Sequence, residues 1–196
     1  MAGSGTLAVP CLGGPAVPTD REPFGPFPTG TTICVDERNA GSEDGSPAHP
    51  FNTIQEGLGA AIAGDQVGVA PGTYFEHVIM KDGVDLVGHS APTTTIDAGG
   101  AGSAVVCANA KLEGFTVTNA GGWNNSGINC SNGSSPTISN NIVAGNQAVG
   151  IRMLNSSATV LGNTISGNPE FAGPCPCNSI DAIQSAPLIF SQHDFG

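Results

Sequence analysis

Arg152 is one of the few basic residues in the later part of the sequence, and its side chain could act on a polysaccharide. Beyond residue 50 the only basic residues are Lys81, Lys111 and Arg152. A guanidinium can clamp a carboxylate through two parallel hydrogen bonds, and in an active site it can act as a base. The alternative is a solvated arginine on an exposed strand. We therefore predict Arg152 as the candidate catalytic residue.

Trp123 is the only tryptophan and lies in the segment 121–125, where Gly, Trp and Asn residues follow one another. An indole ring offers a flat apolar face to a sugar ring, and asparagine amides both donate and accept hydrogen bonds. We therefore expect Trp123, Asn124 and Asn129 to form a carbohydrate-binding surface. The alternative is that the tryptophan folds back over the protein and packs against it.

Acidic residues crowd the polar segment 36–50. Asp36, Glu37 and Asp44 carry hard oxygen ligands of the kind that Ca²⁺ binds, so calcium is the candidate cofactor. Their spacing does not follow that of a calcium-binding loop, and a hydrated acidic loop is the alternative.

The elements that must position these side chains appear as an internal repeat. Residues 134–146 recur as 156–168, an offset of 22, and residues 127–130 match 150–153 at an offset of 23. Short strands separated by Gly and Asn turns, with a period in the low twenties, are typical of the coils of a parallel β-helix. The predicted fold class is therefore all-β, a single-stranded parallel β-helix or solenoid.

Alternation along the strands predicts which side chains face the interior. Asn129 and Arg152 are expected to point outward, and their apolar neighbours inward. The expected interior residues are Ile128, Cys130, Ile151 and Met153. Asn141 is expected above Asn163, with the side-chain amides bonded from coil to coil.

A short helix is predicted near residues 53–63, ahead of the first complete coil. Thr53 and Glu56 have the spacing of a capping box. The apolar face of this helix should cover the open end of the stacked sheets, and it consists of Ile54, Leu58, Ala61 and Ile62. Further on, Pro71 and Gly72 have the pattern of a type II turn, and 111–117 is expected to form one strand.

Six cysteines fit an oxidising compartment. Cys107 and Cys130 fall at strand positions. We expect a disulfide among the four that lie nearer the two ends: Cys11, Cys34, Cys175 and Cys177. Residues 1–30 lack the basic and apolar regions of a secretory signal, so either a signal was removed or the chain is a piece of a larger protein. The expected location is extracellular or at the cell surface.

The chain divides into two predicted regions. Residues 1–30 form an irregular arm or linker rich in Pro and Gly, and residues 31–196 form the β-helix domain. The last repeat copy begins at Ser185 and is cut off in mid-coil at Gly196. An uncapped coil exposes unpaired backbone groups, so we expect self-association through open ends, which could build filaments.

The net charge restricts the possible partners. Five basic and 16 acidic residues give a charge of −11, which repels nucleic acids and acidic lipid surfaces. An acidic polysaccharide would need a divalent cation to bridge the like charges. No apolar run is long enough to cross a bilayer, so no membrane span is expected.

Four segments together resemble the N-terminal cap and first coils of the pectin-lyase-like superfamily of right-handed parallel β-helix proteins. These segments are Pro50–Glu56, Ala70–Glu76, Leu86–Gly88 and Thr94–Asp97. Similar segments occur in pectin methylesterases and in bacterial surface proteins with β-helix repeats. The resemblance extends over roughly residues 31–196 and implies a right-handed solenoid.

The catalytic motifs of that superfamily are not matched, and no acidic residue lies between Glu113 and Glu170. We therefore expect a non-catalytic extracellular scaffold or surface protein that associates end to end. One alternative is a carbohydrate-binding module that uses Trp123. Another is a polysaccharide lyase, esterase or hydrolase with an unrecognised site, in which Arg152 would be the residue to test.

Overall fold

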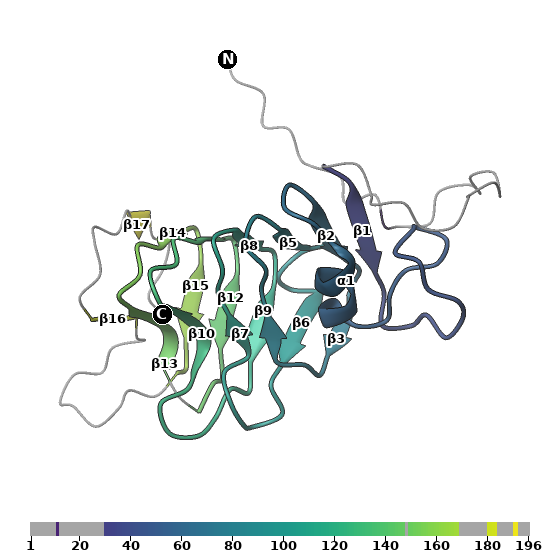
Figure 1. Cartoon of the computed structure of the whole chain (residues 1–196). Helices are drawn as coiled ribbons and strands as arrows, with labels where there is room; N and C mark the ends of the chain where they lie inside the picture. Colours follow the sequence, from purple (N-terminus) through teal and green to yellow (C-terminus); the bar gives the residue numbers. More distant parts are fainter. Residues whose placement is uncertain (1–10, 12–29, 148, 169–179, 184–189, 192–196) are drawn as a thin grey trace, which may run out of the picture.

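The computed structural model describes residues 11, 30–147, 149–168, 180–183 and 190–191. In these residues the chain winds into stacked coils, and each coil adds one strand to each of three sheets (Figure 1). Every pairing between the strands is parallel. This confirms the predicted parallel β-helix.

Sheet 1 consists of β1 (Thr32–Val35), β2 (Gln66–Val69), β5 (Asp85–Gly88), β8 (Lys111–Glu113), β11 (Thr137–Ser139), β14 (Thr159–Leu161) and β17 (Phe190–Ser191). Sheet 2 consists of β3 (Gly72–Tyr74), β6 (Thr94–Asp97), β9 (Thr116–Thr118), β12 (Ile142–Ala144) and β15 (Thr164–Ser166). Sheet 3 consists of β4 (Val78–Ile79), β7 (Val105–Val106), β10 (Ser126–Ser131), β13 (Val149–Leu154) and β16 (Ile180–Ile183).

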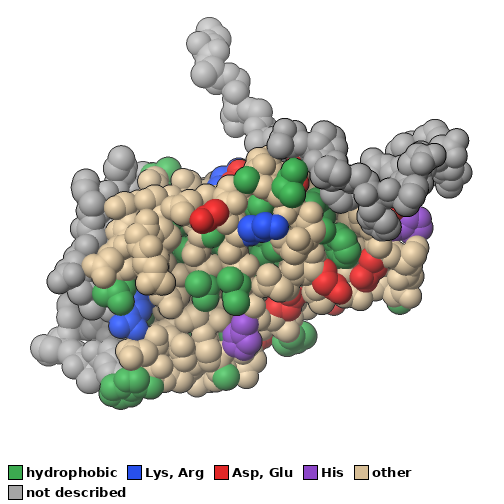
Figure 2. Space-filling view, viewed as in Figure 1, with side chains coloured by type: hydrophobic (Ala, Val, Ile, Leu, Met, Phe, Trp, Pro, Cys, Tyr) green, Lys and Arg blue, Asp and Glu red, His purple; other side chains and the backbone are tan. Residues whose placement is uncertain are grey.

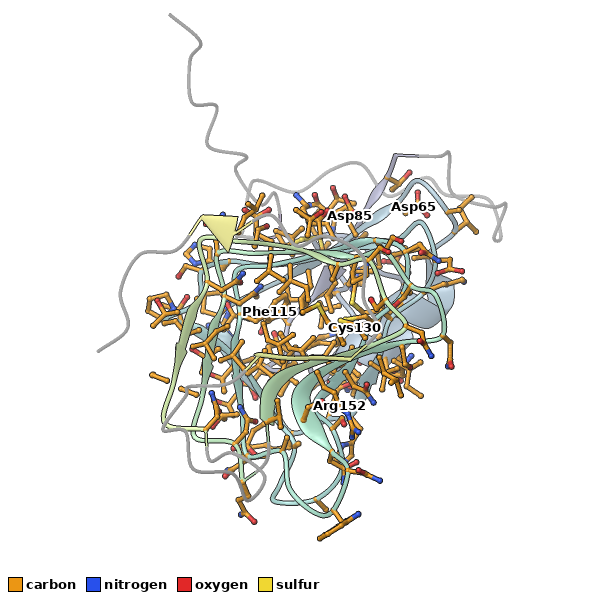
Figure 3. All side chains as sticks on the ribbon, turned by 90° about the vertical axis from the view of Figure 1, so that its left-hand side faces the viewer. Asp65, Asp85, Phe115, Cys130 and Arg152 are labelled. Atoms are coloured by element: carbon orange, nitrogen blue, oxygen red, sulfur yellow. A yellow bond between two sulfur atoms is a disulfide. The ribbon has the colours of Figure 1, made fainter. Side chains whose placement is uncertain are left out.

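The core consists of rows of apolar side chains that run along the axis of the solenoid. Because the strands are short and in register, a residue that faces inward in one coil lies on an inward residue of the next. The inner row of sheet 1 is Ile33, Val67, Leu86, Leu112, Ile138 and Val160. Figure 3 looks along the axis and shows Phe115 and Cys130 inside the coil. Each such side chain contributes about 1.5–3 kcal/mol when it leaves water.

Asn141 and Asn163 form the predicted ladder at the turn between sheets 1 and 2. The Asn141 amide nitrogen Nδ2 donates to Asn163 Oδ1 at 3.0 Å, and the Asn141 backbone N–H donates to the same oxygen at 2.9 Å. The preceding residues, Asn140 and Gly162, have φ of 55° and 61°. In each coil the residue in this left-handed conformation turns the chain, and the asparagine that follows it points inward. The predicted ladder of bonded asparagines is confirmed.

A second ladder, which we did not predict, lies at the turn between sheets 2 and 3. Asn146 Nδ2 donates to Asn168 Oδ1 at 2.9 Å, and the Ala120 backbone N–H donates to Asn146 Oδ1 at 3.0 Å. Gly145 and Gly167 precede the two asparagines with φ of 65° and 61°. At both turns a residue in the left-handed conformation precedes a buried asparagine. The asparagine amide bonds to backbone groups that would otherwise need water as a partner.

The segment predicted as one strand over 111–117 is two strands, β8 and β9, with a corner at Gly114. Gly114 has a φ of 81°, and a Cβ built on it would lie 2.6 Å from the oxygen of Gly88 in the preceding coil. The prediction of one strand was wrong, because the buried residues Leu112, Phe115 and Val117 are spaced by three and then two residues, which breaks the alternation of a single strand at the corner. Phe115, fully buried, occupies the ladder position that Asn141 holds in the next coil.

The helix α1 (Ile54–Ala60) covers the N-terminal end of the core, as predicted for residues 53–63. Thr53 caps it: Oγ1 accepts from the Glu56 backbone N–H at 3.3 Å and donates to the Glu56 carboxylate at 2.6 Å. The helix is shorter than predicted. Ile62 therefore lies beyond its end and is 37% exposed, so its placement on the buried face was wrong.

Gln55 of α1 completes the edge of sheet 3. Its Oε1 accepts from the Ile79 backbone N–H at 2.9 Å, and its Nε2 donates to the Ile79 oxygen at 3.4 Å. The Gln55 amide thus bonds to β4 as a neighbouring strand would, so the backbone N–H and oxygen of Ile79 at the edge of the sheet are paired.

The type II turn predicted at Pro71 and Gly72 is not formed. Gly72 begins β3 and pairs with Thr94, and its φ is not among the positive values that such a turn requires. Pairing with β6 therefore outweighs the local turn preference of the two residues.

A disulfide joins Cys11 to Cys34 of β1, as expected for the cysteines nearer the ends. Cys175 and Cys177 lie outside the described residues, as do most of the predicted arm, the predicted repeat copy at 185–189 and the coil end expected to self-associate. In sheet 1, β17 places Phe190 opposite Val160. Within the described part, no helix has the length and apolar character needed to cross a bilayer.

Candidate functional site

Arg152 and Asn129 lie side by side on the outer face of sheet 3. They are register partners on β13 and β10, and both are half-buried. Their neighbours along the two strands, Ile128, Cys130, Ile151 and Met153, have no exposed surface. The predicted inward and outward sets are therefore confirmed.

The loop of residues 119–125 projects between β9 and β10 and carries Trp123. Its base is fixed, because the Gly121 backbone N–H donates to the Gly102 oxygen at 3.0 Å and Asn125 Nδ2 donates to the Gly121 oxygen at 2.8 Å. Asn124 has a φ of 63°, which turns the chain sharply after the tryptophan. Trp123 is 76% exposed, so it does not fold back over the coil.

Arg152 ties this loop to the outer face of sheet 3. Its Nη1 donates to the backbone oxygen of Asn124 at 2.9 Å and to Asn124 Oδ1 at 3.3 Å. Arg152 Nε is buried and has no hydrogen-bond partner in the described part of the chain. The structure thus brings together Trp123, Asn124, Asn129 and Arg152, and we call these four residues the Trp123–Arg152 patch.

The outer row of sheet 3 contains further residues that we did not predict. In register order the row is Ile79, Val106, Asn129 and Arg152. Ile79 is 61% exposed. On the side of the molecule that Figure 2 shows, acidic and basic side chains lie scattered among uncharged groups and small separate hydrophobic patches. Asp181 takes the register position next to Arg152, and the repeat offset of 22 or 23 could not reveal it because the intervening stretch is longer.

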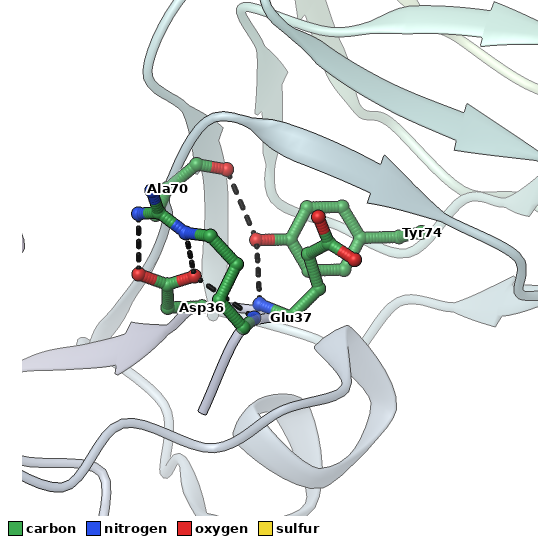
Figure 4. Close-up of polar contacts among 5 residues, drawn as sticks. Asp36, Glu37, Ala70 and Tyr74 are labelled. Carbon is green, nitrogen blue, oxygen red and sulfur yellow. Dashed lines mark hydrogen bonds and ion pairs between the residues drawn. The ribbon is translucent and has the colours of Figure 1, made fainter. Parts of the chain in front are cut away.

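The three predicted calcium ligands have separate protein contacts. Asp36 accepts from Arg38 Nη2 at 2.7 Å and Nε at 2.8 Å, and this hydrogen bonding lowers the pKa of the Asp36 carboxyl. Asp44 Oδ1 accepts from the Ser46 backbone N–H at 2.8 Å. The Glu37 backbone N–H donates to the Tyr74 hydroxyl at 3.3 Å (Figure 4).

No group of three or more His, Cys, Asp or Glu side chains that could hold a metal ion occurs in the described part. Calcium binding by the segment 36–50 stays a prediction. Tyr74 has a structural role there, since its hydroxyl donates to the Ala70 oxygen at 3.0 Å and burial raises the pKa of the phenol well above its usual value.

A shallow depression of about 420 Å³ lies on sheet 1, away from the Trp123–Arg152 patch. It is lined by Asp85, Asn109, Ala110, Lys111, Ser135 and Thr137. Its polar groups already bind neighbouring coils: the Lys111 backbone N–H donates to Asp85 Oδ1 and the Ser135 backbone N–H to Asn109 Oδ1, each at 2.9 Å. These groups stabilise the stacking, and we do not assign the depression as the functional site.

Residues 53–195 match the family described as right-handed beta helix region. The chain belongs to the right-handed β-helix family. The match begins at the N-cap of α1 and includes every strand from β2 to β17, which agrees with the resemblance to the pectin-lyase-like superfamily. No curated protein and no solved structure gives a match to this right-handed β-helix.

Proposed function

We propose that this right-handed β-helix binds a polysaccharide through the Trp123–Arg152 patch. The observation that carries the proposal is the 76% exposure of Trp123 on a loop that Arg152 holds at Asn124, the residue after the tryptophan. A large aromatic ring held in water by a fixed backbone is suited to a ligand with its own flat apolar face.

The indole ring supplies the apolar part of such a contact. Covering roughly 80 Å² of ring surface at about 25 cal/mol per Å² contributes about 2 kcal/mol. This energy alone gives weak binding, so several sugar units or several protein contacts are needed. The outward side chain of Asn129 and the amide of Asn124 supply donors and acceptors for hydroxyl groups.

Arg152 acts in this proposal as a positioning and clamping residue. Its Nη1 donates to two oxygens of Asn124, which supports a donor role over a base role. The chain charge of −11 opposes a polyanion, so the ligand class that fits best is a neutral polysaccharide.

The test is retention of the full chain on a panel of insoluble neutral and acidic polysaccharides, with and without Ca²⁺. Trp123→Ala is expected to weaken retention about tenfold or more. Phe75→Ala is the matched control, because Phe75 is also 76% exposed but lies between β3 and β4, outside the patch. Equal retention of the wild type and Trp123→Ala would contradict the proposal that the patch binds a polysaccharide.

A self-associating scaffold, which was the first expectation from the sequence, is the second proposal. The repeated coil supports it, because coils that stack within one chain through backbone hydrogen bonds can stack between chains in the same way. Light scattering over a wide range of protein concentration tests this proposal. A constant monomer mass at the highest concentration would exclude end-to-end assembly.

A further inference from the structure

Cys107 and Cys130 occupy neighbouring positions in consecutive coils of sheet 3. Val106 and Asn129 are register partners, and the Cys107 backbone N–H donates to the Asn129 oxygen at 2.8 Å. The residues that follow this pair, Cys107 and Cys130, are therefore side by side. Both are free thiols in the structure.

The side chains of the two cysteines point to the same side of the sheet. Val106 faces outward, so Cys107 faces the interior and packs against the core, where Cys130 is fully buried (Figure 3). Cys107 and Cys130 are thus neighbouring thiols on the inner side of sheet 3.

The separation of the two residues suits a covalent bond. Neighbouring strands of a sheet lie about 4.8 Å apart. Disulfides join residues whose Cα atoms are roughly 4.4–6.8 Å apart, provided that the Cβ vectors do not diverge. Parallel in-register neighbours meet the Cα condition with Cβ vectors that run alongside each other, and the two Cβ atoms must then approach from about 4.8 Å to roughly 3.5–4.5 Å.

We propose that Cys107 and Cys130 form a disulfide that joins two consecutive coils when the protein meets an oxidising small-molecule disulfide such as oxidised glutathione. Cys107, the more accessible of the two, attacks one sulfur of the oxidant and releases one glutathione. Cys130 then attacks the Cys107 sulfur and releases the second. The two protein thiols lose two electrons and two protons, and one oxidised glutathione becomes two glutathione thiols.

The environment of the thiols makes this reaction slow and selective. Burial, together with contact with the Cys130 thiol, raises the pKa of Cys107. A thiol with a raised pKa supplies little thiolate at neutral pH, so solvent oxidants react with it slowly. Once Cys107 carries a mixed disulfide, however, the adjacent Cys130 resolves it without any diffusion step.

Tryptic mapping of the native full chain after incubation with oxidised glutathione tests the proposal. Trypsin cleaves after Arg21, Arg38, Lys81, Lys111 and Arg152. Each cysteine pair then falls in its own fragments: Cys11 and Cys34 in 1–21 and 22–38, Cys107 and Cys130 in 82–111 and 112–152, and Cys175 with Cys177 in 153–196. Free thiols are blocked with an alkylating reagent in acidic denaturant before digestion, which prevents exchange.

The expected result is a fragment 82–111 linked to 112–152, with two hydrogen atoms fewer than the sum of the reduced fragments. Cys130→Ala should instead leave a glutathione adduct on 82–111, since the resolving thiol is absent. Recovery of both wild-type fragments alkylated or glutathionylated but unlinked would overturn the proposal. Linkage of either fragment to 153–196 would overturn it too.

Discussion

The guanidinium of Arg152 donates to the backbone oxygen of Asn124 at 2.9 Å, so that each of two neighbouring coils contributes one partner to a single contact. The loop that carries Trp123 enters β10, whereas Arg152 belongs to β13 of the next coil. The position of the tryptophan therefore depends on correct stacking of the coils as well as on the loop itself.

Arg152→Ala should loosen the 119–125 loop. Without the guanidinium, Asn124 loses two hydrogen bonds that cross between coils. We expect faster amide hydrogen exchange in the loop and about tenfold weaker polysaccharide retention, with the exchange of β10 unchanged. Arg152→Lys keeps the charge but has no planar fork, and it should restore only part of both effects. Unchanged exchange in the loop would contradict this role.

Asn141→Ala should lower the free energy of unfolding by about 3 kcal/mol, measured by urea denaturation. Asn141 Oδ1 accepts from the Phe115 backbone N–H at 2.9 Å, and Nδ2 donates to the Leu112 oxygen at 3.0 Å. Each buried backbone group left without a partner costs about 1–3 kcal/mol. Asn140→Gly is the control, since Asn140 is exposed at a φ of 55° that glycine also adopts and the variant loses only an exposed hydrogen bond to Glu113. Equal losses in the two variants would argue against the ladder.

Gly114→Ala should lower the free energy of unfolding by about 3 kcal/mol, which combines left-handed backbone strain with a close contact. The new Cβ would lie 2.6 Å from the Gly88 oxygen. Gly133→Ala is the control with the same strain: its φ is 79° against 81° for Gly114, and no atom lies within 4 Å of its Cβ. In thermal or urea unfolding, the free energy of unfolding of Gly133→Ala should be about 1–2 kcal/mol below that of the wild type, and that of Gly114→Ala should be lower still.

Glu113 should stabilise the protein at neutral pH and lose this effect in acid. Burial raises the pKa of Glu113, but hydrogen bonds from Lys111 and Asn140 and the Lys111 charge outweigh it, and the pKa lies below the usual 4.5. Between the lowered pKa of the folded protein and the usual 4.5, the unfolded chain binds more protons than the folded protein does, so the free energy of unfolding rises with pH. The contribution is present above about pH 4.5 and disappears as the pH falls through the lowered pKa.

The variant Glu113→Gln measures this contribution directly. Wild type and variant are compared by urea denaturation between about pH 6 and pH 3. The difference in unfolding free energy should be largest near neutral pH and should shrink towards zero in acid. Other carboxyl groups, such as Glu76, whose pKa burial raises, are common to both proteins and cancel in the comparison. A difference that does not change with pH would contradict the assigned ion pair.

The repeat made most of the fold predictable from the sequence. The offset between Asn141 and Asn163 fixed the coil period, and alternation around Arg152 fixed its outward direction. The corner at Gly114 was missed because strands were assigned from the run of apolar residues, without the change of spacing between Leu112 and Phe115. There the left-handed glycine and the close passage of Gly88 decide the path.

The candidate site was predictable only as separate residues. Trp123 and Arg152 drew attention through their chemistry, but the contact with Asn124 spans 28 positions and involves a loop without a copy in the next coil. The Gln55 contact with Ile79 was hidden for the same reason, since a side chain there takes the place of a strand. A sequence repeat predicts only the contacts that recur from coil to coil, and neither the Arg152–Asn124 contact nor the Gln55–Ile79 contact recurs.

The two asparagine ladders have a consequence for how such a chain changes length in evolution. Asn141 and Asn163, like Asn146 and Asn168, are separated by 22 positions, and each amide bonds backbone groups of the coil before it. A tandem duplication of 22 codons would therefore insert a coil whose donors meet acceptors on both sides. Genes of this kind can lengthen or shorten by whole turns while the encoded protein keeps its outer face.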